Sequence, residues 1–156
     1  MILRLAELHD APAIAALSKS EIERGLDWSW KPARVSKAIA DPETNVVVAT
    51  EGQELIGFGI MVYRYESAYL CLFAVEPSRR RRGIGSAILA WLERVAAVAG
   101  IQRLALEARA DNVRALSFYE KHGYRRAAII TGMYQGLADG VRLEKPLLSS
   151  NAAGVQ

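Results

Sequence analysis

Residues 68–98 constrain the fold more than any other part of the chain. They begin with a continuous apolar run, AYLCLFAV, which predicts a central strand covered on both faces. The segment EPSRRRRGIG follows, and an apolar pattern with helical spacing then runs from Ile84 to Val98. A buried strand that passes through a glycine-containing loop into an amphipathic helix is typical of α/β proteins.

The loop of this segment, residues 79–86, has the composition of an anion-binding site. The start of a helix carries N–H groups without intrahelical partners and a partial positive charge. Gly83 and Gly85 stand at this helix start behind four arginines, and glycine lets a ligand approach the backbone closely. The stretch therefore predicts a phosphate cradle. The alternative is a solvated run of charge before an ordinary helix.

Two well-known phosphate motifs do not fit this loop. The P-loop needs a lysine after its second glycine, but Ser86 follows Gly85 directly. The dinucleotide fingerprint needs a third glycine where Ile88 stands. Both motifs are therefore excluded, and the two interpretations that remain are a phosphate cradle of another kind and a solvated run of charge.

The remaining patterns predict alternating helices and strands. Asp10 is placed to cap a first helix with Pro12 in its first turn, and Pro32 is placed to open a second. In the strand RLALEAR the leucines face one way and Glu107 faces the other. The expected strands are residues 2–6, 45–50, 54–64, 68–75, 103–109, 124–131 and 141–146, and the second and third should form a hairpin. This order predicts an α/β fold with a mixed sheet.

Composition narrows the class of protein. A chain of 156 residues suits a single domain, here expected over residues 1–147, with residues 148–156 as a flexible tail. The net charge of +3 permits an anionic ligand but does not demand nucleic acid. A single cysteine, Cys71, excludes an internal disulfide and favours the cytoplasm. We expect no membrane span and, with two histidines, no metal site.

Two segments resemble the signatures of the GNAT superfamily of N-acetyltransferases. LFAVEPSRRRRGIGSAILAWLE resembles its acetyl-coenzyme A signature, with Arg80-x-x-Gly83-x-Gly85 as the core. EARADNVRALSFYEKHGYRR resembles the second signature of the family, and the two occur in the family's order and spacing. The matching positions of the second signature are Asn112, Ala115, Tyr119, Gly123 and Tyr124.

The resemblance implies a GNAT fold, a mixed and mostly antiparallel sheet splayed in a V with helices on both faces. It also implies acetyl-CoA as cosubstrate, with its pyrophosphate on the backbone of residues 80–86 and its acetyl carbonyl near Val75. Homodimers are common in the family. The cofactor-binding residues expected from the resemblance are Phe73, Ala74, Val75, Arg80, Arg81, Arg82, Gly83, Ile84, Gly85, Ser86, Asn112, Ala115 and Phe118. Asn112 could instead be a plain helix cap.

Tyr119 and Glu107 are the candidate catalytic residues. In the family the tyrosine that matches Tyr119 protonates the leaving thiolate, whereas the alternative is a core tyrosine packed with Phe118. In the ribosomal-protein N-terminal acetyltransferase branch, a glutamate in a similar LEVR strand acts as base, and here the strand reads LEAR. Alternatively, Glu107 is a structural residue paired with Arg109 or Arg103, and the base is Glu76 or water.

Three aromatic residues are candidates for the acceptor site. Trp28 and Trp30 lie in the loop that walls the acceptor site in the family, although they could simply cover the core. Tyr134 resembles a tyrosine that closes over the acceptor in the same branch, without the flanking acids of that branch. Cys71 lies in an apolar strand, so we expect it in the core rather than as a carrier of the acetyl group.

These observations predict an N-acetyltransferase that moves acetyl from acetyl-CoA to a primary amine by direct attack. The acceptor is either a protein N-terminus or a small-molecule amine, and we expect neither nucleic acid nor membrane as a partner. The alternative is an acyl-CoA-binding regulatory or sensor domain without turnover. Tyr119 favours the enzyme, because a sensor needs no acid at that position.

Overall fold

The computed structural model describes residues 1–147, so the expected tail lies outside the described residues. They form two compact units. The first comprises Met1–Tyr63 and Cys71–Val95, and the second comprises Arg64–Leu70 and the residues from Ala96 onward. In the order in which they pair, the strands are β1 (Ile2–Leu5), β2 (Thr44–Glu51), β3 (Glu54–Tyr63), β4 (Ser67–Val75), β5 (Arg103–Arg109), β7 (Ala138–Pro146) and β6 (Arg125–Tyr134). β4 and β5 are parallel, whereas the pairs β1–β2, β2–β3, β5–β7 and β6–β7 are antiparallel. The predicted mixed, mostly antiparallel sheet is confirmed.

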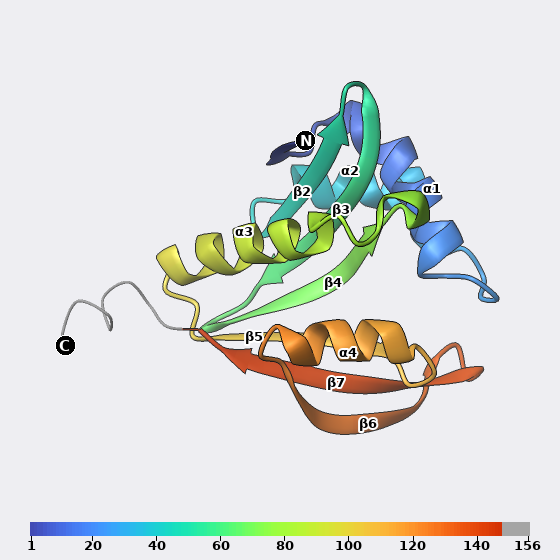
Figure 1. Cartoon of the computed structure of the whole chain (residues 1–156), viewed down its shortest axis with the longest axis vertical. Helices are drawn as coiled ribbons and strands as arrows, with labels where there is room; N and C mark the ends of the chain where they lie inside the picture. Colours follow the sequence, from blue (N-terminus) through green and yellow to red (C-terminus); the bar gives the residue numbers. More distant parts are fainter. Residues whose placement is uncertain (148–156) are drawn as a thin grey trace. The chain divides into compact units, whose positions relative to one another are not determined.

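The first unit is built on a long hairpin. β2 (Thr44–Glu51) and β3 (Glu54–Tyr63) pair along their length, and β1 (Ile2–Leu5) adds to the free edge of β2 (Figure 1). The predicted turn is confirmed, because Glu51 pairs with Glu54 across Gly52 and Gln53. Helices α1 (Ala11–Glu21) and α2 (Pro32–Ala40) contribute Ile14 and Val35 to a buried apolar cluster with Phe58.

Helix α3 (Ile84–Val98) packs closely against β3 at two glycines. A Cβ at Gly57 would stand 2.9 Å from Ile88 Cδ1, and one at Gly59 would stand 2.8 Å from Leu92 Cδ1. Real Cβ atoms do not come so near to other heavy atoms, so the ends of these two side chains would have to shift, and the glycines let α3 lie close to the strand. The close contact holds the start of α3, and with it the loop before it, on the sheet.

The start of α1 differs from the prediction. Asp10 stands at the N-cap position, but its side chain makes no capping hydrogen bond to the helix. Its carboxylate instead accepts from the Arg4 guanidinium at 2.8 and 3.0 Å and from the backbone N–H of Glu7 at 2.8 Å, closing the short 3-10 turn Leu8–Asp10. The expectation of a cap is wrong because a cation and a nearer N–H compete for the same oxygens.

Strand β4 (Ser67–Val75) also differs from the prediction. Its even-numbered residues, from Ala68 to Ala74, are buried, whereas its odd-numbered residues, from Ser67 to Val75, remain half-exposed. The expectation of cover on both faces is therefore wrong. An apolar run has no period, so it does not reveal that large side chains such as Tyr69 and Phe73 keep part of their surface accessible.

The second unit is a smaller sheet. The first residues of β4, Ser67 to Leu70, pair in parallel with β5 (Arg103–Arg109), and β7 (Ala138–Pro146) pairs antiparallel with β5. β6 (Arg125–Tyr134) completes a hairpin with β7, and helix α4 (Val113–Lys121) contacts β6 (Figure 1). Leu104 and Leu106 are fully buried, and Glu107 faces the other side of β5 and lines a cavity there, as the alternation predicts.

Candidate active site

The loop that leads into α3 is held in place by hydrogen bonds of Glu76 within the first unit. The backbone N–H of Glu76 donates to the carbonyl of Ile56 at 2.8 Å. The carboxylate of Glu76 then accepts from the N–H of Ser78 at 3.0 Å, which caps the 3-10 turn Pro77–Arg79. Glu76 thus has a structural task, which makes it a poor candidate for the base.

The four arginines of the loop are not equivalent. Arg79 pairs with Glu51 and Glu54 at 2.8 Å each, and Arg82 also pairs with Glu51 at 3.1 Å. Arg80 pairs with Glu21 of α1 at 2.8 Å, and the Glu21 side chain is only 10% exposed. These pairs compensate three of the four charges within the first unit.

Arg81 is the exception. Its side chain has no ion pair or hydrogen bond among residues 1–147, it is exposed, and its backbone lies in the left-handed region at φ 66°. The sequence predicted an arginine block that acts together at the rim of a cradle. In the structure the ion pairs fasten the loop, and Arg81 is the member with an uncompensated charge.

The start of α3 has the geometry of an anion site. The N–H of Ala87 donates to the carbonyl of Gly83 at 3.0 Å, so the amides of Ile84 and Gly85 precede the hydrogen-bond ladder of the helix. Gly83 has φ +77°, and no atom lies within 4 Å of the place where its Cβ would be. Space is therefore open beside N–H groups that a phosphate can accept from.

Glu107 is the central charged residue of the second unit. Its side chain is 7% exposed, and its Oε1 accepts from Arg142 Nη1 at 3.1 Å. Arg142 is held in turn by Glu144, to which its Nε donates at 2.9 Å. Glu107 Oε2 is buried and has no hydrogen-bond partner among the described residues. A buried carboxylate oxygen without a hydrogen bond lowers the stability of the fold unless a ligand or a water molecule donates to it.

The prediction that Glu107 pairs with Arg109 or Arg103 is wrong. Register places Glu107 directly opposite Arg142 on β7, so this arginine reaches it first. Arg109 lies 3.4 Å from Asp111, and Arg103 lies 3.9 Å from Glu144. Sequence reasoning missed Arg142 because strand patterns alone do not fix the register of two strands that lie far apart in the chain.

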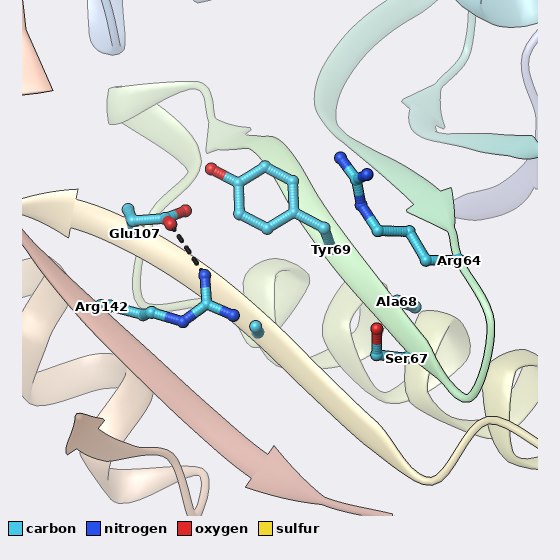
Figure 2. Close-up of a pocket in the computed structure, with 7 residues that line it drawn as sticks. Arg64, Ser67, Ala68, Tyr69, Glu107 and Arg142 are labelled. Atoms are coloured by element: carbon cyan, nitrogen blue, oxygen red, sulfur yellow. Dashed lines mark hydrogen bonds and ion pairs between the residues drawn. The ribbon is translucent and has the colours of Figure 1, made fainter. Parts of the chain in front are cut away.

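A cavity of about 380 Å³ lies beside Glu107 (Figure 2). Figure 2 shows the ring of Tyr69 extending from β4 toward Glu107 on β5, with Arg142 beside the carboxylate. Tyr69 and Arg64 were not among the residues expected at the site. Tyr69 lies on the half-exposed face of β4, which the apolar run conceals, whereas Arg64 precedes β4 and no local pattern marks it. The lining residues are Arg64, Ser67, Ala68, Tyr69, Ala105, Glu107 and Arg142.

Tyr119 is buried in α4 and belongs to an aromatic cluster. Its ring centroid lies 5.4 Å from that of Phe118 and 5.8 Å from that of Tyr124, both edge to face. Burial, and then the nearby Tyr134, raise the pKa of Tyr119 well above its ordinary value. The packing fits the expected core tyrosine, and a phenol that stays protonated at neutral pH also fits a general acid.

Tyr134 is linked electrostatically to both candidate catalytic residues. Burial, followed by the charge of Glu107, raises the pKa of Tyr134 to about 12, while Arg109 opposes the shift. The guanidinium carbon of Arg109 lies 6.0 Å from the centre of the Tyr134 ring. Glu107, Tyr119 and Tyr134 therefore influence one another within the second unit.

Asn112 caps α4, as the simpler interpretation predicts. Its Oδ1 accepts from the N–H of Ala115 at 3.1 Å. Because this oxygen is engaged in the cap, the helix start and not a bound cofactor explains the position of the Asn112 side chain. Phe118 belongs to the aromatic cluster of Tyr119 and, at 4.3 Å between ring centroids, also packs on His122.

The loop with two tryptophans is fastened by a buried carboxylate. Glu23 is 6% exposed, and its carboxylate accepts from the N–H and hydroxyl of Ser29 at 2.8 and 2.5 Å and from the N–H of Trp30 at 3.3 Å. Trp28 and Trp30 are half-buried against the apolar cluster of the first unit. Both side chains therefore contribute to the core.

Metal ligands and membrane spans were both expected to be absent. Within residues 1–147 no three His, Cys, Asp or Glu side chains gather where they could hold a metal ion. Among the same residues no helix is both long and apolar enough to span a bilayer.

Sheet and helices together define an α/β protein of the acetyltransferase type, and comparisons with known proteins agree. The model of the Acetyltransferase (GNAT) family matches residues 3–124. The ribosomal protein bS18-alanine N-acetyltransferase of Escherichia coli K12 is 31% identical over 101 residues, which make up 63% of this chain and 68% of that protein.

Solved structures show the same fold. The ribosomal-protein-S18-alanine N-acetyltransferase from Escherichia coli has a TM-score of 0.82 at 24% identity, over 96% of this chain and 95% of that one. The PaiA N-acetyltransferase of Thermoplasma acidophilum, in complex with coenzyme A, has a TM-score of 0.77 at 19% identity, over 93% and 98%.

The chain belongs to the GNAT acetyltransferase family. It is an acetyltransferase of a family that uses acetyl-CoA, so the interpretation as an enzyme is confirmed.

Proposed function

We propose that the protein transfers the acetyl group of acetyl-CoA to a primary amine by direct attack. The observation that carries this proposal is the buried, singly paired carboxylate of Glu107 beside a cavity. The distribution of chemical groups over the two compact units also supports the proposal. The first unit holds the helix start that suits a pyrophosphate, and the second holds groups that suit proton transfer.

In the proposed cofactor site, backbone amides of residues 83–86 bind the pyrophosphate of acetyl-CoA. Gly83 leaves the backbone accessible, and α3, in which Gly85 is the second residue, supplies the positive end of its dipole. Arg81 adds the charge that the loop does not compensate internally, while Arg80 and Arg82 act mainly by fixing the loop to Glu21 and Glu51. Phe73, Ala74 and Val75 at the end of β4 bind the pantetheine arm and the acetyl carbonyl.

In the proposed reaction the acceptor ammonium first loses a proton to Glu107, directly or through one water. The amine nitrogen then forms a bond to the thioester carbon and loses its second proton. The bond from carbon to sulfur breaks, and Tyr119 gives a proton to the departing thiolate. The second amine proton passes to the tyrosinate, directly or through water, which restores Tyr119, and Glu107 releases the first proton to solvent. The products are an N-acetylated amine, free coenzyme A and one proton, and no other reactant is needed.

Acceptor binding is proposed for Trp28, Trp30 and Tyr134. The two tryptophans are only half-buried, and the charge of Glu107 acts on the Tyr134 phenol, which supports this assignment. A protein N-terminus is one candidate acceptor, because the Escherichia coli relative is named for the alanine of a ribosomal protein. A small-molecule amine is the other. Homodimerisation and a cytoplasmic location stay predictions.

An acceptor panel tests the proposal. The full chain is incubated with acetyl-CoA and with peptides or small primary amines, and free thiol release is followed together with the mass of each acceptor. We expect thiol release that depends on the acceptor and matches the amount of acetylated amine. Binding of acetyl-CoA without transfer to any amine of a broad panel would contradict the proposal.

A further inference from the structure

The cavity beside Glu107 carries two charged groups with unmet bonding capacity. One is Glu107 itself, whose side chain is more than nine-tenths buried and whose Oε2 has no partner among the described residues. The other is Arg64, at the turn that leads into β4. Its guanidinium has neither a hydrogen bond nor an ion pair within residues 1–147.

The second arginine of the cavity is already occupied. Arg142 donates to Glu107 at 3.1 Å and to Glu144 at 2.9 Å, so two carboxylates compensate its charge. Arg64 has no such carboxylate within the described part of the chain, which leaves it as the cation of the lining that can accept an anionic partner. Figure 2 shows Arg64 and Glu107 on opposite sides of the Tyr69 ring.

We propose that this cavity binds an acceptor that carries an anionic group near its primary amine, with the ammonium at Glu107 and the anion at Arg64. The inference rests on the proposed function and names its substrate class. An ammonium completes the unpaired carboxylate oxygen, and a carboxylate or similar anion completes the guanidinium. Glu107 gains because its buried oxygen is otherwise without compensation. Arg64 is exposed, and it contributes a positive charge that no carboxylate of the described residues pairs.

The size of the cavity agrees with such a ligand. About 380 Å³ lies within the range of small-molecule sites, roughly 300–1,000 Å³. It suits a free amino acid, or the first residues of a peptide with an acidic side chain close to its N-terminus. Ser67 and Tyr69 add hydroxyl groups to the same wall. The shared chemistry of the two sources is an amine and an anion within one short ligand.

The test compares acceptors that differ only in charge. Acetyl transfer is measured with peptides that begin Ala-Asp, Ala-Asn or Ala-Lys and share the remaining sequence, and with amino acids and their amides. We expect kcat/KM about three- to tenfold higher for the acidic member than for its neutral partner, which is the size of a partly exposed charge pair. Preference among peptides alone identifies a protein acceptor, and preference among amino acids alone identifies a small one.

Variants of Arg64 then assign the preference to the cavity. Arg64→Gln should abolish the preference for the acidic acceptor, and Arg64→Glu should reverse it in favour of the basic peptide. Arg94→Gln is the matched control, because Arg94 is an exposed arginine of α3 outside the cavity and should leave the preference unchanged.

The outcomes separate this inference from the proposed function. Transfer to amines without preference for an anion, or a preference that survives Arg64→Glu, overturns the inference and leaves the acetyltransferase intact. Absence of transfer to any amine overturns both.

Discussion

At the scale of single residues, Glu107 combines burial with incomplete pairing. Arg142 binds one of its oxygens and so keeps the carboxylate oriented, while the other oxygen is buried and has no hydrogen-bond partner among the described residues. A purely structural glutamate in a sheet would have both oxygens satisfied. This difference is the physical reason to assign Glu107 the role of base.

Replacement of Glu107 by glutamine tests that role. Glu107→Gln should lower kcat/KM for the amine, most strongly on the acid side of the pH profile, and activity should recover partly at high pH, where free amine is abundant. The measurement is the pH dependence of kcat/KM with saturating acetyl-CoA. A profile that keeps the wild-type shape would show that water is the base and that Glu107 only pairs with Arg142.

Tyr119 is the second residue whose role is testable alone. Tyr119→Phe keeps the ring in contact with Phe118 and Tyr124 and removes only the hydroxyl. We expect kcat to fall by about 10²- to 10⁴-fold, as for loss of a general acid, while the Kd of acetyl-CoA stays the same. Because burial raises the pKa of Tyr119, the wild-type acid should remain active throughout the neutral and mildly alkaline range. A wild-type kcat in the variant would leave Tyr119 as a core residue.

Asp10 provides a prediction about stability. The hydrogen bond from Arg4 lowers the pKa of Asp10 below its ordinary value, against the opposing effect of burial. A lowered pKa means that the stabilisation is present above the unfolded pKa of about 3.9 and is lost as pH falls through the folded pKa. Asp10→Asn should therefore reduce the free energy of unfolding by about 1–3 kcal/mol at pH 7, and this difference should shrink below about pH 4.

Urea titrations at both pH values check this prediction. Glu120→Gln is the control, since the pair of Glu120 with Arg126 is exposed and contributes little. A difference for Asp10→Asn that persists at low pH would mean that shape, rather than charge, accounts for the loss.

At the scale of elements, sequence periodicity locates strands and helices well and their partners poorly. The alternation in RLALEAR identifies both faces of β5, and the glycine turn identifies the β2–β3 hairpin. The side chain opposite Glu107 depends on the register of β5 with β7, which lies more than thirty residues further along the chain. The ion pairs of the arginine block were likewise not predictable from the local sequence, because Glu21, Glu51 and Glu54 belong to other elements.

The contact of α3 with β3 can be tested as a pair of elements. Gly59→Ala introduces a Cβ at 2.8 Å from Leu92 Cδ1, so the buried leucine must shift. We expect a loss of about 1–3 kcal/mol in the free energy of unfolding. Leu92→Ala should lose about 2–5 kcal/mol by opening a cavity. The double variant should lose less than the sum, because each change relieves the other.

Thermal or urea unfolding of the two single variants and the double variant completes this cycle. Strict additivity would contradict the close contact of helix and strand at Gly59.

At the scale of the whole molecule, motifs carry more information than composition. The chain is short, mildly basic and poor in histidine and cysteine, which excludes classes of protein without naming one. The pairing of a glycine loop at a helix start with a second helix that carries Tyr119 points to the family, and the family model confirms it. The acceptor is not predictable in this way, because it depends on residues such as Arg64 and Tyr69 that belong to no motif.

The central claim is that the amine attacks acetyl-CoA directly, without an acetylated enzyme. Cys71 is the alternative nucleophile, but its half-buried side chain packs against the apolar cluster of the first unit. Initial rates over a matrix of acetyl-CoA and amine concentrations, for the wild type and for Cys71→Ala, test the claim most directly. We predict double-reciprocal lines that intersect and a variant that retains the wild-type kcat. Parallel lines, with activity lost in Cys71→Ala, would contradict the account and assign the acetyl group to the cysteine.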